Sequence, residues 1–414
     1  MVAPHVQQDA RALWEANMLH KFHTAIFDDP HLWRQRCAVR AGRVIGFNFA
    51  RELRKRTLQE LPTDLVSQSS WRELIRLVAG RIDRPQRLGD RIWEWAEPGF
   101  DRDVARHCLN RDVEAVFGYE HACLHTLRAA AESGRRRILV IPAPEPGYVK
   151  SMLAAELDLV PELRIPLQKQ VAAREANRAA RRKAEWDLAD VIMVASQFTR
   201  QSFVEAGWDV SKVSVVPLEA PAPVANSRRL PVTSHDEPLK LIWAGTFSIR
   251  KGAHYIIEAW RKYDLGQVAQ LSVYGSNGLP DSLGNPIPDG IQLHGTLSRD
   301  EPMPLYGQAD ALLFPTLCDG FGMVATEAWA QGCPVITTCR AGAADLLKDG
   351  QNGKLIEARS ADAIAEVVTW CHENRDALVS MREPARLTAQ ARQWSDYRAQ
   401  VVDTIRTKWE DVPA

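Results

Sequence analysis

Short apolar runs rich in β-branched residues alternate with longer stretches of helical periodicity through much of the chain. The runs are continuously apolar, a pattern typical of parallel strands that are covered on both faces. We expect buried strands at residues 137–142, 191–196, 213–217, 239–245, 271–275, 310–315 and 334–338. The pattern therefore predicts an α/β protein.

One segment interrupts this alternation and another departs from it. Residues 220–238 are rich in Pro, Ser and Asn and have no periodicity, which indicates a linker between two α/β units. Residues 31–108 are mainly helical in pattern and rich in Trp and Arg, which predicts a helical insert. The chain enters a helix-like stretch at residues 7–19 almost at once, so we expect a few residues to be missing before a clipped first strand.

Composition agrees with a cytoplasmic globular protein. The length of 414 residues predicts two or three domains, of which we expect two, and 45% hydrophobic with 25% charged residues is an average balance. No apolar run reaches the roughly 18 residues of a membrane span, and the start lacks a signal-peptide pattern. Seven cysteines without a Cys-x-x-Cys pair indicate reduced, mostly buried thiols.

Charge is distributed unevenly although the net charge is zero. Residues 1–225 hold 33 Lys and Arg against 29 Asp and Glu, and the rest holds 19 against 23, so the halves carry net charges of about +4 and −4. Arg-rich stretches at residues 51–56 and 135–137 favour contact with an anionic membrane surface or an acidic acceptor. A solvated helix face explains the same residues.

Residues 244–260, "AGTFSIRKGAHYIIEAW", predict an anion site. A strand ends at Gly245, a loop carries Arg250, Lys251 and Gly252, and an amphipathic helix begins near His254. Free N–H groups at the start of such a helix face the carboxyl end of the strand, and two adjacent cations suit a diphosphate without a metal. A surface basic pair beside a turn is the alternative interpretation.

Residues 318–338, "CDGFGMVATEAWAQGCPVITT", hold two acids eight positions apart. We expect Asp319 in a loop after the strand at 310–315 and Glu327 just over one turn into a helix at 323–330. Gly320 and Gly322 would let the backbone close around a ligand. Two carboxylates could serve glycoside hydrolysis, or they could bind sugar and ribose hydroxyls as acceptors. Alternatively, Asp319 caps the helix and Glu327 is a solvated residue.

The order of these segments resembles a known family. Gly245 with the Arg250-Lys251-Gly252 loop, "LHG" at 293–295 and the run from 309 to 356 resemble the C-terminal half of the retaining GT-B glycosyltransferases of family 4. That family has an E-x7-E motif, E-G-F-G-x-x-x-x-E-A, which reads DGFGMVATEA at 319–328. The close resemblance covers residues 239–357, whereas residues 1–180 match only in outline.

The resemblance implies a GT-B fold with two Rossmann-like parallel-sheet domains facing across a cleft. Residues 1–225 would form the acceptor domain, including the insert at 31–108, and residues 226–238 the linker. Residues 239–385 would bind the nucleotide sugar. Residues 386–414 resemble a C-terminal helix that crosses back to the first domain.

The resemblance also implies roles for individual residues. Glu327 would bind the ribose of a nucleotide sugar, and Asp319 the hydroxyls of the transferred sugar. Arg250 and Lys251 would hold the diphosphate and stabilise it as it leaves. The remaining donor-binding positions would be Gly245, Thr246, Gly295, Phe321, Gly322, Met323 and Val324.

Two departures and one candidate acceptor residue complete the prediction. The first acid is Asp rather than Glu, and position 246 is Thr where some relatives have Arg, so phosphate binding would depend more heavily on Arg250 and Lys251. The family often places a histidine near a strand end of the acceptor domain, which makes His121 the candidate here. His121 and His125 also imitate a metal site, but we expect no metal because no further ligands are evident.

The resemblance predicts a metal-independent hexosyltransferase (EC 2.4) that retains anomeric configuration in polysaccharide or glycoconjugate synthesis. Its partners would be a UDP- or GDP-sugar, which serves as co-substrate in place of a cofactor, and a saccharide or lipid-linked acceptor, with no nucleic acid. It would be cytoplasmic and could lie against the inner face of the membrane. A non-catalytic GT-B relative that binds sugar nucleotides or acts as a scaffold, and a hydrolase or phosphorylase, are the alternatives. A dinucleotide oxidoreductase is excluded because no Gly-x-Gly-x-x-Gly follows a strand.

Overall fold

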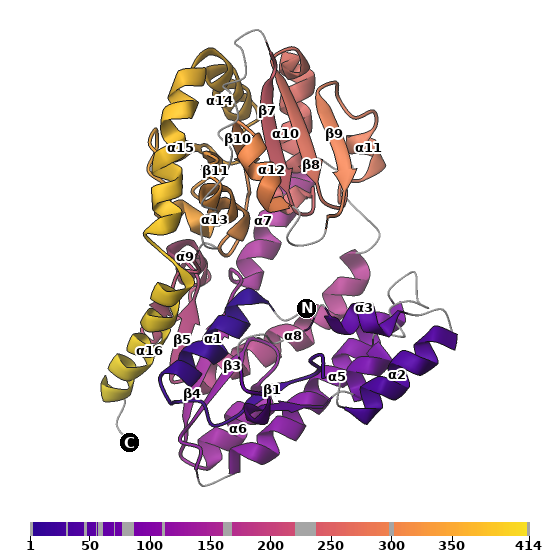
Figure 1. The fold of residues 1–414 in the computed structure, drawn as a ribbon, viewed down its shortest axis with the longest axis vertical. Helices are drawn as coiled ribbons and strands as arrows, with labels where there is room; N and C mark the ends of the chain where they lie inside the picture. The colour runs from indigo at the N-terminus through magenta and orange to yellow at the C-terminus, as the bar shows by residue number, and fades with distance from the viewer. Residues whose placement is uncertain are drawn as a thin grey trace. The chain divides into compact units, whose positions relative to one another are not determined.

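The chain forms two compact units (Figure 1). The first consists of Met1–Val140, Glu175–Met193 and Arg398–Ala414, and the second of Ile141–Arg174 and Val194–Tyr397. The computed structural model describes residues 3–29, 32–44, 48–54, 56, 61–69, 71–76, 87–109, 112–159, 168–219, 237–297 and 302–411.

A six-stranded parallel sheet organises the second unit. Its strands lie in the order β12-β11-β10-β7-β8-β9, and every pairing is parallel. The strands are β7 (Leu239–Ala244), β8 (Ala269–Tyr274), β9 (Ile291–Gly295), β10 (Ala311–Phe314), β11 (Val335–Thr338) and β12 (Gly353–Ile356). The order reverses beside β7, and in open α/β sheets ligands bind at the carboxyl ends of the strands near such a point.

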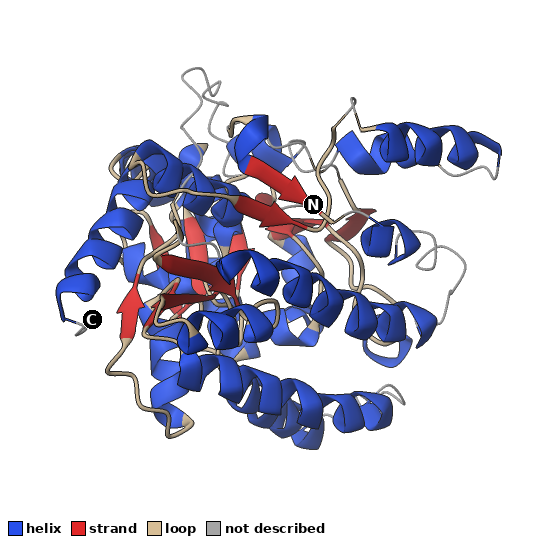
Figure 2. Cartoon of the chain, turned by 90° about the horizontal axis from the view of Figure 1, so that it is seen from below, coloured by secondary structure: helices blue, strands red, loops and turns tan. Residues whose placement is uncertain are grey.

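Helices pack against both faces of this sheet, because its buried residues divide between two cores. Figure 2 distinguishes the helices and strands of the chain by colour. The helices of this unit are α7 (Pro146–Leu159), α9 (Gln197–Glu205), α10 (Ala253–Tyr263), α11 (Asp281–Gly284), α12 (Pro302–Gln308), α13 (Met323–Ala330), α14 (Ala361–Glu373) and α15 (Arg375–Gln390). Short 3-10 turns lie at η4 (Ile249–Lys251), η5 (Leu265–Gln267) and η6 (Gly342–Leu346).

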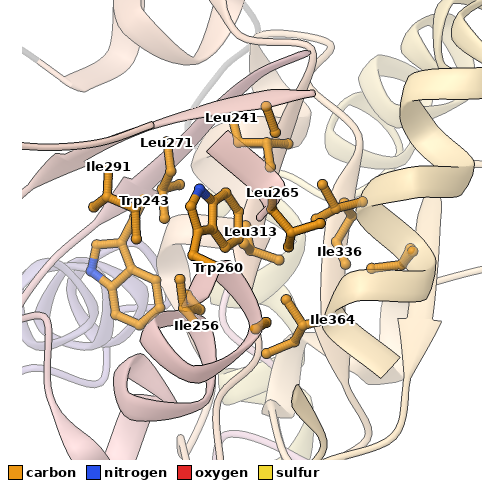
Figure 3. Packing of buried hydrophobic residues seen from close by; sticks show 14 of the residues in the cluster. Leu241, Trp243, Ile256, Trp260, Leu265, Leu271, Ile291, Leu313, Ile336 and Ile364 are labelled. Atoms are coloured by element: carbon orange, nitrogen blue, oxygen red, sulfur yellow. The ribbon is translucent and has the colours of Figure 1, made fainter. Parts of the chain in front are cut away.

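The apolar residues of β7 divide between the two faces because side chains alternate along a strand. Leu241 and Trp243 pack with α10 and α14 in one core, which Figure 3 shows around Trp243 and Trp260. Ile242 and Ala244 pack with α12, α13 and α15 in the other. Burial of each large side chain contributes roughly 1.5–3 kcal/mol, so the sheet is a firm support for loops at its edge.

The first unit contains a two-stranded parallel sheet of β1 (Phe22–Thr24) and β2 (Val66–Gln68). A four-stranded sheet has the order β3-β4-β5-β6, in which β3 and β4 are parallel. Its strands are β3 (Ala115–Tyr119), β4 (Arg136–Ile141), β5 (Val191–Val194) and β6 (Val213–Val215), of which β6 falls in the residue range of the second unit. The remaining helices are α1 (Pro4–Glu15), α2 (Trp33–Val44), α3 (Phe49–Arg54), α5 (Arg87–Ala105), α6 (Leu124–Glu132), α8 (Gln168–Leu188) and α16 (Trp394–Asp411), with 3-10 turns at η1 (Thr63–Leu65) and η2 (Arg106–Leu109).

The strands expected from continuous apolar runs are all observed, and the α/β class is confirmed. The early helix is α1, and the helix expected at 323–330 is α13. The predicted domain boundaries stay a prediction, and all but the last two residues of the linker at 226–238 lie outside the described residues. Within the described part of the chain, no helix is both long and apolar enough to cross a membrane.

Candidate functional site

The loop after β7 carries the predicted basic pair. The loop is fixed to the next strand end because the Phe247 amide donates to the Ser276 carbonyl at 2.9 Å. It then turns through η4, where Arg250 and Lys251 lie, into α10. Gly252 has φ of 80°, and a Cβ there would lie 2.1 Å from the Pro315 carbonyl oxygen. Only glycine therefore allows the basic loop to press against the end of β10.

The loop after β10 brings Asp319 to the same place. Asp319 Oδ2 lies 3.7 Å from Arg250 Nη1 and 3.8 Å from Lys251 Nζ. Both distances exceed hydrogen-bond length, so the acid balances the cations without being tied to either one. Its backbone is held firmly, since its amide donates to the Arg340 carbonyl and its carbonyl accepts from Gly342, each at 3.0 Å.

Lys251 is the more buried of the two cations. Its side chain is 14% exposed, against 40% for Arg250. Burial lowers the pKa of Lys251, and the positive charge of Arg250 lowers it further, while Asp319 and Glu327 act in the opposite direction. The Nζ atom also lies 5.3 Å from the centroid of the Phe314 ring, within cation–π range. A buried ammonium with this environment gains from an additional anion.

The start of α13 faces this loop. Gly322 caps the helix with φ of 84°, and a Cβ there would lie 2.8 Å from the Phe314 ring. Phe321 is buried beneath the turn. The first helical amides, those of Met323 and Val324, have no acceptor among the described residues. Such amides and the helix dipole attract an anion, which the turn would admit beside Lys251.

Glu327 lies one turn further along α13 and is half-buried. The hydroxyl of Tyr306, on α12, donates to Glu327 Oε2 at 3.2 Å. Tyr306 is fully buried, and burial followed by the negative charge of Glu327 raises its pKa well above the usual range. The sequence offered no signal for this pair because a tyrosine in an apolar helix is an ordinary core residue.

Further predicted site residues lie at the carboxyl ends of β7 and β9. Thr246, which follows β7, is exposed and accepts from the Ser276 hydroxyl at 3.3 Å. Gly295 is exposed with φ of 78°, and its carbonyl accepts from the Gly275 amide at 2.8 Å. A Cβ on Gly245 would lie 3.0 Å from Lys251 Nζ, so Gly245 lies close to the basic pair.

His121 belongs to the first unit, whereas the other predicted site residues belong to the second. It lies in the turn between β3 and α6 with φ of 72°, a left-handed conformation uncommon for histidine. Its Nε2 atom lies 3.3 Å from Arg182 Nη1. Among the described residues, no group of three or more His, Cys, Asp or Glu is placed to hold a metal ion.

Two buried carboxylates hold the turn that contains His121, and the sequence did not reveal them. Glu185 accepts from the amides of His121 at 2.7 Å and Cys123 at 3.3 Å. Asp101 accepts from the amides of His125 and Thr126 in α6, at 2.7 and 3.0 Å, and from Arg181 at 2.9 Å. The start of α6 is thus occupied by side chains of the protein itself.

The two parallel-sheet units define the class of protein. Solved structures with this fold include Anabaena Alr3699/HepE in complex with UDP-glucose, at TM-score 0.54 and 15% identity over 93% of this chain and 98% of that one. Sucrose-phosphate synthase from Thermosynechococcus elongatus has TM-score 0.56 and 18% identity, covering 77% of this chain and 79% of that one. The fold is that of GT-B glycosyltransferases, as predicted. Residues 229–394 match the family Glycosyl transferases group 1.

Two curated relatives each match more than half of the chain. The D-inositol 3-phosphate glycosyltransferase of Xylanimonas cellulosilytica is 25% identical over 59% of this chain and 60% of its own length. A GDP-mannose-dependent alpha-(1-6)-phosphatidylinositol monomannoside mannosyltransferase of Mycobacterium tuberculosis is 25% identical over 53% of this chain and 62% of its own length. The chain therefore spans less than two thirds of the length of these relatives.

Proposed function

We propose that the protein is a glycosyltransferase that moves a hexose from a UDP- or GDP-sugar to an acceptor hydroxyl with retention of anomeric configuration. The observation that carries the proposal is the meeting of Arg250, Lys251 and Asp319 beside the open start of α13. The match of residues 229–394 to group 1 glycosyl transferases and the UDP-glucose bound to a protein of the same fold support it.

The roles follow from the charges along the strand ends. Arg250, Lys251 and the first amides of α13, at Met323 and Val324, would neutralise the diphosphate. Glu327 would accept hydrogen bonds from the ribose. Gly245, Thr246 and Gly295 would line the donor along β7 to β9, and Phe321 and Gly322 would shape the turn against the sugar.

The chemical step places its developing charge on the diphosphate. The bond from the anomeric carbon to the diphosphate oxygen breaks, and its electron pair stays with the diphosphate. The acceptor oxygen forms a new bond on the same face of the sugar, and its proton passes to the leaving diphosphate. Arg250 and Lys251 would stabilise that charge without a metal, and Asp319 would hold the sugar hydroxyls. His121 would line the acceptor side.

We also propose a class of acceptor and a site of action. A saccharide or a lipid-linked acceptor would bind the first unit, and the Arg-rich stretches would meet an anionic membrane surface from the cytoplasmic side. Synthesis of a polysaccharide or glycoconjugate is the corresponding role.

Incubation with a panel of UDP- and GDP-sugars, followed by mass spectrometry of the products, tests the proposal. Release of a nucleoside diphosphate with transfer in EDTA, and an unchanged anomeric configuration by NMR, is the expected result. Glu327→Ala should abolish transfer while circular dichroism shows an intact fold. Nucleotide binding without transfer to any acceptor would instead support a non-catalytic role, and full activity in Glu327→Ala would refute the role of that residue.

A further inference from the structure

Tyr306 and Glu327 form a contact that the proposed function does not yet use. Tyr306 lies on α12 with its side chain fully buried among the apolar residues that α12, α13 and α15 share beneath the sheet. Its hydroxyl reaches the edge of that core and donates to Glu327 Oε2 at 3.2 Å. Glu327 is only half-buried, so its carboxylate stands between the apolar core and the open strand ends.

Apolar packing alone does not account for a tyrosine here. Ring burial needs no hydroxyl, and a phenylalanine would fill the same volume without a polar group to satisfy. The hydroxyl instead meets a carboxylate, the acceptor with which a hydrogen bond is strongest. Loss of the hydroxyl would remove one constraint on the Glu327 carboxylate, whose last torsion is otherwise broad.

We propose that Tyr306 is a positioning residue that orients Glu327 toward the vicinal hydroxyls of a ribose. This inference rests on the proposed function, because the nucleotide is the ligand that Glu327 would bind. A carboxylate can accept from two neighbouring hydroxyls only if both oxygens lie in the correct plane. With Oε2 fixed by Tyr306, the plane of the carboxylate is set before the ligand arrives, which reduces the cost of ordering it.

The measurement that tests the positioning role is the preference for a ribonucleotide over its 2′-deoxy form, taken together with the overall affinity. Tyr306→Phe should weaken UDP or GDP binding by about tenfold, the usual effect of one hydrogen bond to a charged group. The same variant should lose most of the wild-type preference for the ribonucleotide over its 2′-deoxy form. A tyrosine with a purely structural role would lower the thermal midpoint and leave that preference unchanged.

A second tyrosine gives a matched control. The Tyr255 hydroxyl donates to Glu156 Oε2 at 2.8 Å within the same unit, so Tyr255→Phe removes an equivalent tyrosine–carboxylate bond. Glu156 is also contacted by His254 and Arg359, and none of these residues belongs to the proposed donor site. Tyr255→Phe should therefore keep the wild-type ribose preference.

The experiment is isothermal titration of UDP, GDP and their 2′-deoxy forms into wild type, Tyr306→Phe, Tyr255→Phe, Glu327→Ala and the Tyr306→Phe, Glu327→Ala double variant. We expect loss of ribose preference in Tyr306→Phe and no further loss in the double variant relative to Glu327→Ala, because both changes act on one contact. A preference retained by Tyr306→Phe overturns the inference and leaves the proposed function standing. No nucleotide binding by wild type overturns both.

A second variant tests the positioning role without a change at Tyr306. If Tyr306→Phe does not fold, Glu327→Asp withdraws the carboxylate from the hydroxyl while keeping the charge. That variant should bind UDP or GDP with little preference over the 2′-deoxy form. A wild-type preference in Glu327→Asp would overturn the positioning role.

Discussion

Two strand-to-helix turns of this protein differ in whether side chains accept hydrogen bonds from the first amides of the helix. At α6, in the first unit, Glu185 and Asp101 accept from the turn and first-turn amides. At α13, in the second unit, the amides of Met323 and Val324 meet no acceptor among the described residues. The positive end of the helix dipole is neutralised by side chains of the protein at α6, whereas at α13 it meets no acceptor among the described residues.

The charges around the two turns differ in the same direction. Beside α13 two cations share one nearby carboxylate, Asp319, at distances beyond hydrogen-bond length. Beside α6 the charges are already paired, because Arg181 lies against both Asp101 and Glu185. Both turns offer backbone amides, but only the α13 turn has positive charge without a closely bound carboxylate among the described residues. This difference in charge is why we propose the start of α13, rather than that of α6, as the ligand site.

The largest expected effect is a loss of stability on removal of a carboxylate that binds the amides of the α6 turn. Asp101→Ala removes a fully buried carboxylate, leaves two amides without their acceptor and leaves Arg181 with Glu185 as its remaining carboxylate partner, which should cost about 3–5 kcal/mol of unfolding free energy. Urea denaturation followed by circular dichroism measures the loss. Unchanged stability would mean that Asp101 does not hold this turn.

The second effect concerns the cations beside α13. Lys251→Ala should weaken UDP or GDP binding by about 100-fold, because it removes the buried positive charge that would lie beside the diphosphate. Isothermal titration checks this, and Lys262→Ala is the control. Lys262 lies at the far end of α10 in an exposed pair with Asp362, so its loss should not change affinity.

The titration of Lys251 predicts a pH dependence. Burial lowers the pKa of Lys251 from 10.5, so this lysine loses its charge at a lower pH than an exposed lysine does. Affinity for a nucleoside diphosphate should therefore fall with rising pH before pH 10.5 is reached. Lys251→Arg, which stays charged, should remove that fall. Titrations at stepped pH values measure both proteins, and a flat profile for wild type would contradict the assignment.

The smallest effect should come from lengthening the first acid of the motif. Asp319→Glu keeps the charge near Arg250 and Lys251 and extends the carboxylate by about one bond. We expect a change of less than about tenfold in the choice among sugars on one nucleotide, with nucleotide affinity nearly unchanged. Competition between sugar nucleotides, read by mass spectrometry, checks this. Equal ratios in both proteins would mean that Asp319 does not select the sugar.

Local patterns in the sequence correctly predicted the helices and strands around the proposed donor site. The apolar run before Asp319 is β10, because a continuous apolar run is typical of a buried strand, and the helix that carries Glu327 has the predicted bounds. The basic loop could be placed for the same reason, since it follows β7 directly.

Contacts between distant segments could not be predicted in this way. Asp101 and Glu185 reach the α6 turn from α5 and α8, and Tyr306 reaches Glu327 from α12. No spacing rule links such partners, because only the tertiary packing of their helices brings them together. The left-handed backbone conformation of His121 could not be predicted either, because the carboxylate that accepts from its amide lies in another helix.

The most direct test of the account is isothermal titration of UDP and GDP into the wild-type protein in the presence of EDTA. The account predicts that one nucleoside diphosphate binds per chain without a metal, and that Lys251→Ala loses most of the affinity while the α6 turn stays intact. Absence of binding by either nucleotide, or affinity that survives Lys251→Ala, would contradict the claim that the open start of α13 is the donor site.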